Sequence, residues 1–311
     1  MESEFKHISV LQKPAIDLLI AGGGKHFIDG TLGGGGDSAA LLTALPECEV
    51  IGIDRDPTAI AVCQKRLASY GERFHAWHGC FSQLEAAAAS RGWASVDGVL
   101  LDIGVSSPQI DTPERGFSFR FDAPLDMRMD PESGAMTAAD LLNTASEEEL
   151  ADIFFKYGEE KKSRLVARRI VERRQRQKWA RTGELAELLE HCIGRQHQHG
   201  LPPATRVFQA LRIAVNHELD ELENALAAAE RILAPGGRLV VISFHSLEDR
   251  CVKHFIQYAA LPCICPPGFP CTCHKQVTFE PITRKPVVAD EVELALNPRA
   301  ACAKLRAARR V

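Results

Sequence analysis

A glycine-rich turn between two short apolar segments constrains the fold of this chain more than any other feature. The turn, DGTLGGGGD at 29–37, follows the apolar pair Phe27-Ile28. A second apolar segment at 50–53 comes soon afterwards and ends in Asp54. A strand, a glycine turn, a helix and a strand ending in a carboxylate are typical of an α/β sheet that binds a nucleoside cofactor. The sequence therefore predicts an enzyme that uses such a cofactor.

Apolar segments that alternate with helical ones predict a parallel sheet. The expected strands are 27–29, 50–54, 74–78, 96–102 and 239–244. Helices are expected at 57–68 and, from leucines at helical spacing, over about 219–233, before a turn at 234–237. Because strands and helices alternate, we expect an α/β fold with crossover connections. The segments 276–282 and 304–310 are the expected last two strands.

The interval between the fourth and fifth expected strands is too long for a crossover. It spans 137 residues from Asp102 to Leu239, whereas a crossover needs roughly a dozen to a few dozen residues. We therefore place an inserted helical substrate-recognition domain at 108–215. The segments 1–107 and 216–311 then form one discontinuous catalytic domain. An insertion at the carboxyl edge of the sheet would lie over the ligand crevice.

The charge pattern at the strand ends indicates which cofactor to expect. The glycine turn does not fit the dinucleotide pattern G-x-G-x-x-G, since the third glycine falls on Ser38. Asp29, directly before the glycines, would repel a pyrophosphate and attract an amine. S-adenosylmethionine carries an ammonium and a sulfonium, and Asp29, Asp54 and Asp102 would suit its methionine, ribose and adenine or reacting ends. Each carboxylate alone is more simply a solvated strand end or helix cap, but together they predict a pocket.

Several longer segments carry a specific resemblance. They are DGTLGGGGDS at 29–38, DGVLLDIGVSSPQ at 97–109, YGEEK at 157–161, LAPGGRLVVISFHSLEDR at 233–250 and NPRA at 297–300. Together they resemble the MraW family, bacterial S-adenosylmethionine-dependent methyltransferases that methylate cytosine N4 in 16S ribosomal RNA. The resemblance runs from about residue 7 to the C-terminus. It implies a class I methyltransferase fold, a Rossmann-like sheet with an inserted helical domain, and S-adenosyl-L-methionine as cofactor. The implied target is a cytidine in the decoding region of 16S ribosomal RNA, which we expect to be methylated within the small ribosomal subunit.

The resemblance also implies site residues by motif position. The implied cofactor contacts are Gly35, Gly36, Asp37, Asp54, Phe81, Asp102 and Gln109. The family usually has His where Asp37 stands, so this residue is expected to contact the cofactor through its backbone amide. Methylation of an exocyclic amine also needs acceptors that orient the amine and take a proton. We expect Asp102, Asp126 and His245 in this catalytic role, with a structural hydrogen bond as an equal alternative for His245.

Three regions of the expected insertion suggest contact with nucleic acid. The segment 161–181 holds ten Lys and Arg residues and one acidic residue, Glu172, in a chain of net charge −4. This local excess favours phosphate contact over an ordinary solvated face. In 115–130, phenylalanines at 117, 119 and 121 alternate among arginines, which suits an extruded base or, equally, a β-hairpin that buries one phenylalanine face. The polar residues Arg206, Gln209, Arg212 and Asn216 share a helix face that could meet RNA or the catalytic domain.

Four cysteines lie in a loop rich in proline and glycine. Cys263, Cys265, Cys271 and Cys273 form two Cys-x-Cys pairs. Four thiolates are a sufficient zinc set, but the pairs are tighter than the usual Cys-x2-Cys. We therefore prefer reduced surface thiols, keep a structural metal staple as the alternative, and assign no catalytic metal.

The lengths of the apolar runs and the N-terminal residues indicate where the protein is located. No apolar run reaches the ~20 residues that span a bilayer, and the N-terminus lacks the features of a signal peptide, so we expect a cytoplasmic protein without a membrane partner. A homodimer stays open.

Two other functions are kept as alternatives. One is a DNA amino-methyltransferase, disfavoured because Asp102 is not followed by a Pro-Pro-aromatic motif. The other is an RNA-binding or ribosome-assembly protein that keeps the fold without turnover.

Overall fold

The chain folds as two compact units. The computed structural model describes residues 9–194, 202, 204–266, 268 and 270–311, so the N-terminal residues considered for a signal peptide lie outside it. One unit, called here the sheet unit, comprises Met1–Gly104 and Leu219–Val311. The other, the helical unit, is Val105–Glu218. The expected boundaries at 107/108 and 215/216 each fall three residues from these.

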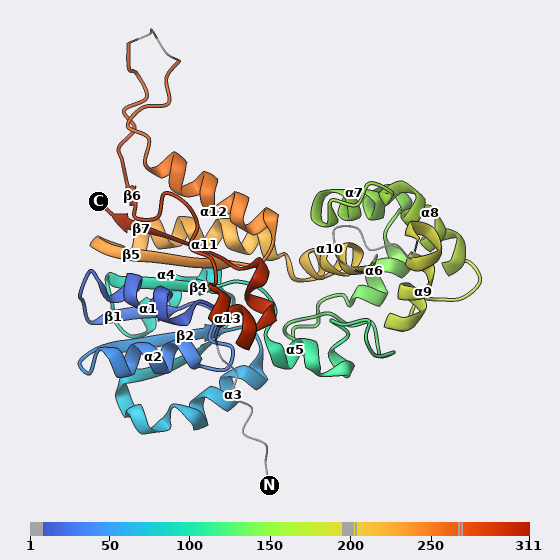
Figure 1. Ribbon diagram of the computed structural model, residues 1–311, viewed down its shortest axis with the longest axis horizontal. Helices are drawn as coiled ribbons and strands as arrows, with labels where there is room; N and C mark the ends of the chain where they lie inside the picture. The colour runs from blue at the N-terminus through green and yellow to red at the C-terminus, as the bar shows by residue number, and fades with distance from the viewer. Residues whose placement is uncertain (1–8, 195–201, 203, 267, 269) are drawn as a thin grey trace. The chain divides into compact units, whose positions relative to one another are not determined.

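The sheet unit is built on a seven-stranded sheet with the order β3-β2-β1-β4-β5-β7-β6 (Figure 1). The strands are β1 (His26–Asp29), β2 (Glu49–Asp54), β3 (Phe74–His78), β4 (Val96–Asp102), β5 (Leu233–Ser243), β6 (Phe279–Pro281) and β7 (Lys304–Arg310). The first five pair in parallel, and β7 runs antiparallel to both β5 and β6. All seven expected strands are present, so the α/β prediction is confirmed.

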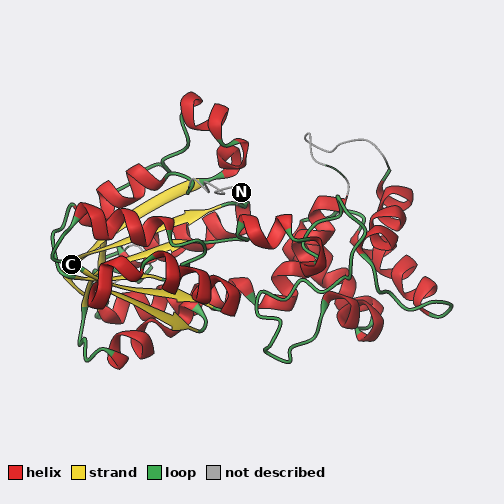
Figure 2. Ribbon diagram, turned by 90° about the horizontal axis from the view of Figure 1, so that it is seen from below, coloured by secondary structure: helices red, strands yellow, loops and turns green. Residues whose placement is uncertain are grey.

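Helices cover both faces of this sheet, as Figure 2 shows. They are α1 (Gln12–Ile20), α2 (Gly36–Ala44), α3 (Pro57–Arg66), α4 (Leu84–Ser90), α11 (Glu218–Ile232), α12 (Ser246–Ala259) and α13 (Glu291–Leu296). Successive residues of β4 serve opposite faces: Val99 and Leu101 join the core under α4, α11 and α12, and Leu100 joins the core under α1 and α2. A strand covered on both faces must be apolar at nearly every position, which explains the continuous hydrophobic runs.

The expected turn at 234–237 appears as a bulge inside β5. Val96 of β4 pairs with Leu233, and the next pair joins Gly98 to Arg238. The residues between therefore loop out of the ladder, and Gly236 there has a φ of +85°. The helix before this turn ends at Ile232, as its leucine spacing predicts.

The helical unit has its own hydrophobic core. Its helices are α5 (Ser107–Asp111), α6 (Ala138–Thr144), α7 (Glu147–Gly158), α8 (Ser163–Arg174), α9 (Thr182–Ile193) and α10 (Ala204–Asn216). Phe154 of α7, Ile170 of α8, Leu189 of α9 and Leu211 of α10 are fully buried against one another's helices and around Trp179. The inserted segment is therefore helical, as the sequence predicts. Within the part of the chain described, no helix of either unit is long and apolar enough to cross a membrane.

Candidate cofactor site

The glycine turn joins β1 to α2 at the carboxyl edge of the sheet. Gly35 caps α2 with a φ of +73°, a conformation that L side chains rarely adopt. A Cβ at this position would also lie 2.9 Å from Sγ of Cys63, which packs beneath the turn. Gly36 opens the helix, so its amide and those after it are free to face a ligand. Glycine is thus required here for backbone geometry and for close packing.

Asp29, at the end of β1, is held inside the turn. Its side chain is 1 % exposed. Oδ2 accepts a hydrogen bond from Oγ of Ser38 at 2.7 Å, and Oδ1 accepts one from the Thr31 amide at 3.2 Å. Asp37 lies in the first turn of α2, is also buried, and accepts a hydrogen bond from Nε2 of Gln12 at 3.2 Å. Both carboxyl groups therefore have fixed positions.

Asp54 and Asp102 end β2 and β4 at the same edge. Oδ2 of Asp54 accepts the Gly33 amide and Oδ1 accepts the Asp56 amide, each at 2.8 Å, so this carboxylate ties the glycine turn to β2. The Asp102 amide donates to Oγ1 of Thr31 at 2.6 Å. Oδ1 of Asp102 is buried and has no hydrogen-bond partner among the described residues. An unpaired buried acceptor is costly and is consistent with a ligand donor at this position.

The four carboxyl groups form an acidic cluster in which the pKa of each group is raised. Burial, followed by the charge of Asp37, raises the pKa of Asp29 to about 7. Burial likewise raises the pKa of Asp37 and of Asp54. Burial and the charges of Asp37 and Asp29 raise the pKa of Asp102 well above its usual range. Among the described residues, no Lys or Arg forms an ion pair with Asp29, Asp37 or Asp102. The cluster therefore favours a cationic ligand.

Phe81 lies beside the end of β1. It is in a short 3₁₀ helix (Phe81–Gln83) after β3 and is partly buried against the core of the sheet unit. A Cβ on Gly30 would lie 3.4 Å from its Cβ, which brings Phe81 next to the glycine turn. The sheet unit thus gathers six of the seven expected cofactor contacts. The sequence patterns assign no role to Thr31 in the glycine turn or to Ser38 in α2, which bond to Asp102 and Asp29. They also do not mark Gln12, which bonds to Asp37.

Gln109, the seventh expected contact, lies in the helical unit. It forms a capping box at the start of α5, in which its amide donates to Oγ of Ser106 and its Oε1 accepts from the Ser106 amide at 3.1 Å. Its side chain is buried.

Asp126, an expected catalytic residue, also lies in the helical unit and forms a bidentate ion pair. Nε and Nη2 of Arg128 donate to its two carboxylate oxygens at 2.9 and 2.7 Å. Partial burial alone would raise the pKa of Asp126, but the hydrogen bonds from Arg128 outweigh this and lower it. A carboxylate held in this way is a weak base, so the geometry favours an orienting role over proton abstraction.

His245 caps helix α12. Its Nδ1 accepts the Glu248 amide at 3.4 Å, and Oε2 of Glu248 accepts the amides of Phe244 and His245. Nε2 of His245 lies 2.9 Å from Oε1 of Glu248. The geometry therefore favours a structural hydrogen bond, as the cap of α12, over a catalytic role for His245.

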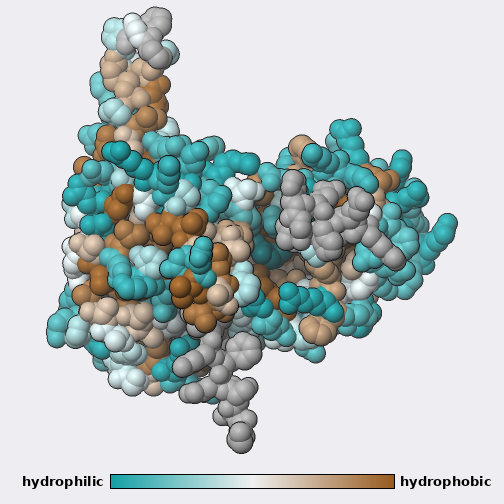
Figure 3. All heavy atoms as spheres, in the orientation of Figure 1, coloured by the Kyte–Doolittle hydropathy of each residue, from teal (hydrophilic) through white to brown (hydrophobic). Residues whose placement is uncertain are grey.

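The basic run of the helical unit divides into two groups. Arg174 donates to the carbonyl oxygens of Leu142 and Ala145 at the end of α6, and Arg173 stacks 3.9 Å from the ring of Trp179. These two arginines stabilise the unit itself. Most of the other cations are exposed, and the outer face of α8 belongs to the hydrophilic surface in Figure 3. Arg164, Arg176 and Lys178 have no ion-pair partner within the part of the chain described.

The other two expected RNA contacts are largely structural. The segment with the three phenylalanines is irregular, joined to Arg181 by one β-bridge at Pro124. Phe117 and Phe119 pack on the core and Phe121 is 56 % exposed, so a hairpin does not form here. The polar face of α10 bonds within the unit: Nε2 of Gln209 donates to the Tyr157 carbonyl and Arg212 pairs with Glu218, for example.

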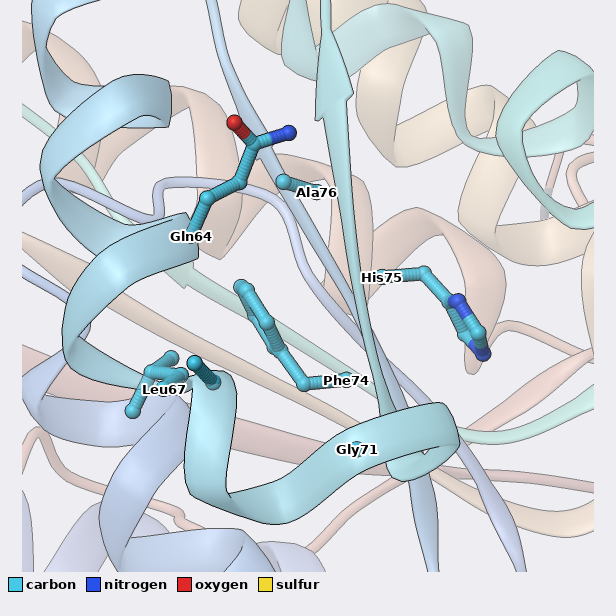
Figure 4. A pocket seen from close by; sticks show the side chains of 7 residues that line it. Gln64, Leu67, Gly71, Phe74, His75 and Ala76 are labelled. Carbon is cyan, nitrogen blue, oxygen red and sulfur yellow. The ribbon is translucent and has the colours of Figure 1, made fainter.

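A pocket elsewhere on the sheet unit is separate from this site. It has a volume of about 350 Å³ and lies between α3 and β3. Figure 4 shows Phe74 pointing toward Leu67 while His75 points away on the other side of the strand. Phe74 begins β3, whereas the carboxylates lie where the parallel strands end. This pocket holds none of the predicted site residues.

The fold and the site together define a protein class. A Rossmann-like sheet with antiparallel β7, a glycine turn after β1 and carboxylates at the ends of β2 and β4 form a class I methyltransferase fold, as the resemblance implies. Residues 4–311 match the profile of the MraW methylase family. The chain is 50% identical over 311 residues to "Ribosomal RNA small subunit methyltransferase H" of Heliobacterium modesticaldum, covering 99% of each chain. It is 49% identical over 310 residues to the protein of the same name from Syntrophotalea carbinolica, covering 99% and 98%. The chain therefore belongs to the MraW methylase family.

Among solved structures, the chain is similar to a putative rRNA-methylase from Clostridium thermocellum. The two share 12% sequence identity with a TM-score of 0.42, and the alignment covers 96% of this chain and 95% of the other. A similarity at this level adds nothing to what the family profile shows.

Proposed function

We propose that this protein transfers the methyl group of S-adenosylmethionine to the N4 amine of a cytidine in the decoding region of 16S ribosomal RNA. The near-complete match to relatives named ribosomal RNA small subunit methyltransferase H supports the substrate. The acidic cluster of Asp29, Asp37, Asp54 and Asp102 is the observation that supports the cofactor. A ribosomal substrate implies action in the cytoplasm, on the small ribosomal subunit.

The residues at the site fit S-adenosylmethionine in charge. Bound there, it would supply an electrophilic methyl group on a positive sulfonium. Asp29 and the amides at the start of α2 would hold the methionine end, with Asp37 contributing its backbone amide. Asp54 uses one lone pair of each oxygen on backbone amides and has others for the ribose hydroxyls. Phe81 would pack beside the nucleoside, and Gln109 is proposed as a further contact.

Asp102 is the proposed catalytic residue on the amine. The N4 lone pair of cytosine is delocalised into the ring, so an acceptor on an N4 hydrogen helps to localise it. Oδ1 of Asp102 is such an acceptor, buried and without a protein partner among the described residues. Its raised pKa also suits a group that takes the proton released on methylation. Holding the amine in line with the methyl group at about 3 Å would supply much of the rate.

Asp126 and His245 are proposed to position groups in and around the site. The ion pair with Arg128 fixes the loop that follows Asp126, and the cap at His245 fixes the start of α12 directly after β5. Neither geometry favours direct proton transfer. The helical unit is proposed to recognise RNA through the exposed cations around α8.

The experiment that tests this function is methyl transfer from labelled S-adenosylmethionine to small subunits taken from a strain that lacks the protein. Nucleoside analysis should then show a new N4-methylated cytidine, and Asp102→Ala should abolish it. Label in DNA but not in ribosomal RNA would favour the DNA amino-methyltransferase. Subunit binding without any transfer would favour an assembly protein without turnover.

A further inference from the structure

The cysteines of the sequence analysis lie in a projecting segment of the sheet unit. Residues 260–278, called here the cysteine arm, connect α12 to β6 and extend away from the sheet (Figure 1). The Thr278 amide donates to the Ala259 carbonyl at 3.0 Å and closes the base of the arm. Pro267 and Phe269, near its tip, lie outside the described residues. The arm thus leaves the sheet and returns to it, carrying one Cys-x-Cys pair on each side.

The four sulfur atoms of the arm converge. The Sγ atoms of Cys263 and Cys271 are 3.5 Å apart, those of Cys271 and Cys273 3.7 Å, and those of Cys273 and Cys263 3.8 Å. All four, including that of Cys265, lie within 4.8 Å of one another. A tetrahedral Zn²⁺ with bonds of about 2.3 Å holds its thiolates about 3.8 Å apart. The three separations among Cys263, Cys271 and Cys273 match edges of that tetrahedron and are much longer than a disulfide bond of about 2 Å.

The backbone around these sulfurs supports thiolate ligands. The Cys265 amide donates to Sγ of Cys263 at 3.3 Å, and the Thr272 amide donates to Sγ of Cys265 at the same distance. Amide donors to sulfur spread the negative charge of bound thiolates and orient them, as outer hydrogen bonds do at metal sites. Residues two apart in extended backbone share a face, so each Cys-x-Cys pair can present both thiols inward.

The arm has no hydrophobic core that could order it. None of its described residues is buried, and Leu261 and Ile264 are 44 % and 50 % exposed. Figure 3 shows apolar residues on the arm without a covering layer. Small segments that cannot bury enough apolar surface are commonly stabilised by a disulfide or a metal. All ten cysteines of the chain are free thiols here, which leaves the metal.

We propose that Cys263, Cys265, Cys271 and Cys273 bind one structural Zn²⁺ ion. Four thiolates fill its tetrahedral coordination and leave no open position for a substrate, so the ion stabilises the arm and takes no part in methyl transfer. A polynuclear iron–sulfur cluster would lie between its cysteines and hold their sulfurs further apart than the observed edges. The geometry therefore reverses our preference, drawn from spacing alone, for reduced surface thiols.

The test is the metal content of the full-length protein and of a variant that lacks half of the ligands. The protein is produced with zinc in the medium and purified under reducing conditions without chelator. We expect about one zinc per chain by elemental analysis and less than about a tenth of that in Cys271→Ser/Cys273→Ser. Replacement of zinc by Co²⁺ should give sulfur-to-cobalt charge-transfer absorption only in the wild-type protein.

The matched control is Cys302→Ser, since Cys302 is an exposed cysteine outside the arm. This variant should keep its full zinc content. Thermal unfolding of the double variant checks that the sheet unit is folded, because neither cysteine belongs to its core. Wild-type protein without zinc, zinc retained by the double variant, or iron in place of zinc would each overturn the proposal.

Discussion

At the scale of single residues, we expect Asp102 to strengthen cofactor binding while it lowers the stability of the cofactor-free protein. Its buried Oδ1 lacks a partner among the described residues and lies near the charges of Asp37 and Asp29. Asp102→Asn removes this repulsion, so we expect the free energy of unfolding of the cofactor-free protein to rise by about 1 kcal/mol. The same change should weaken S-adenosylmethionine binding at least about tenfold, because it removes a buried negative charge. Thermal unfolding and titration calorimetry measure the two effects.

Asp97, near the other end of β4, provides the control for this prediction. Its Oδ2 accepts the amides of Lys25 and His26 at 2.7 and 2.9 Å. Asp97→Asn weakens these bonds and should cost about 1 kcal/mol of stability, without a change in cofactor affinity. Loss of stability in Asp102→Asn with unchanged affinity would contradict the assignment of Asp102.

The raised pKa of Asp29 makes both stability and cofactor binding depend on pH. The folded protein holds this proton up to about pH 7, whereas the unfolded chain releases it near 3.8, mainly because burial penalises the charged form. The folded state therefore binds more protons in this interval. The contribution of Asp29 to stability is greatest below the lower value and falls as the pH rises toward 7.

Burial favours the neutral form of Asp29 in the free protein, whereas a bound cationic cofactor favours the charged form. We expect S-adenosylmethionine to bind more tightly as the pH rises from about 5.5 to about 7.5, with release of a proton. Calorimetry in two buffers of different ionisation enthalpy measures that proton. Asp29→Asn should flatten the pH profile. A wild-type affinity that does not change with pH would count against the acidic cluster as the binding site.

At the scale of elements, the cations of helix α8 and of the residues after it fall into two groups. Some stabilise the helical unit, and the others remain available to bind RNA. Arg164, Arg176 and Lys178 are exposed and have no ion pair among the described residues. Changing all three to Ala should weaken binding to the ribosomal RNA substrate about tenfold at 0.1 M salt and reduce the salt slope by about 2, because up to three phosphate contacts are lost. A binding titration at several salt concentrations measures both.

Arg231 is the control for this loss of charge. It is an exposed cation in the sheet unit, paired with Glu85 at 2.7 Å. Arg231→Ala removes a charge of the same kind and should leave RNA affinity and salt slope unchanged. If the triple variant bound RNA as tightly as the wild type, the helical unit would need another RNA-binding surface.

The cysteine arm gives a second prediction at this scale. Lys275 follows the last ligand by two residues, and its Nζ lies 4.7 Å from the ring of Tyr258. Removal of zinc by a chelator should let the arm open and speed tryptic cleavage after Lys275 at least about tenfold. Mass spectrometry of limited digests measures the rate. Cleavage after Arg91, in the exposed turn that follows α4, should stay constant, and equal acceleration at both sites would argue against a local effect of the metal.

At the scale of the whole molecule, the two units bury separate hydrophobic cores. Ile28, Leu101 and Val241 belong to the sheet unit, whereas Phe154 and Leu189 belong to the helical unit. Units with separate cores can unfold in separate steps. Because six of the seven proposed cofactor contacts lie in the sheet unit, the cofactor should stabilise mainly that unit.

Scanning calorimetry should therefore resolve two transitions. S-adenosylmethionine at 100 times its Kd should stabilise the sheet unit by about 2.7 kcal/mol and shift the other transition much less. Leu189→Ala, at a fully buried position, should destabilise only the other transition, by about 3 kcal/mol. A single transition that both changes shift would show that the two units unfold as one.

The sequence by itself determined the strands, the approximate length of the insertion and the family. Strand ends at Asp29, Asp54 and Asp102 follow from apolar runs that stop at a carboxylate, and such patterns are properties of neighbouring residues. The helical insertion follows from the chain length between two strands. These features need no knowledge of how distant segments pack.

Only the tertiary structure decided what those residues do together. It showed the burial that raises the pKa of Asp29, the pairing of Asp126 with Arg128, the stacking of Arg173 on Trp179 and the convergence of four sulfur atoms in the arm. Each depends on the direction of a side chain and on groups brought near it by folding. The pKa, partner and reactivity of a charged group or a thiol depend on the groups around it, and only folding brings those groups together.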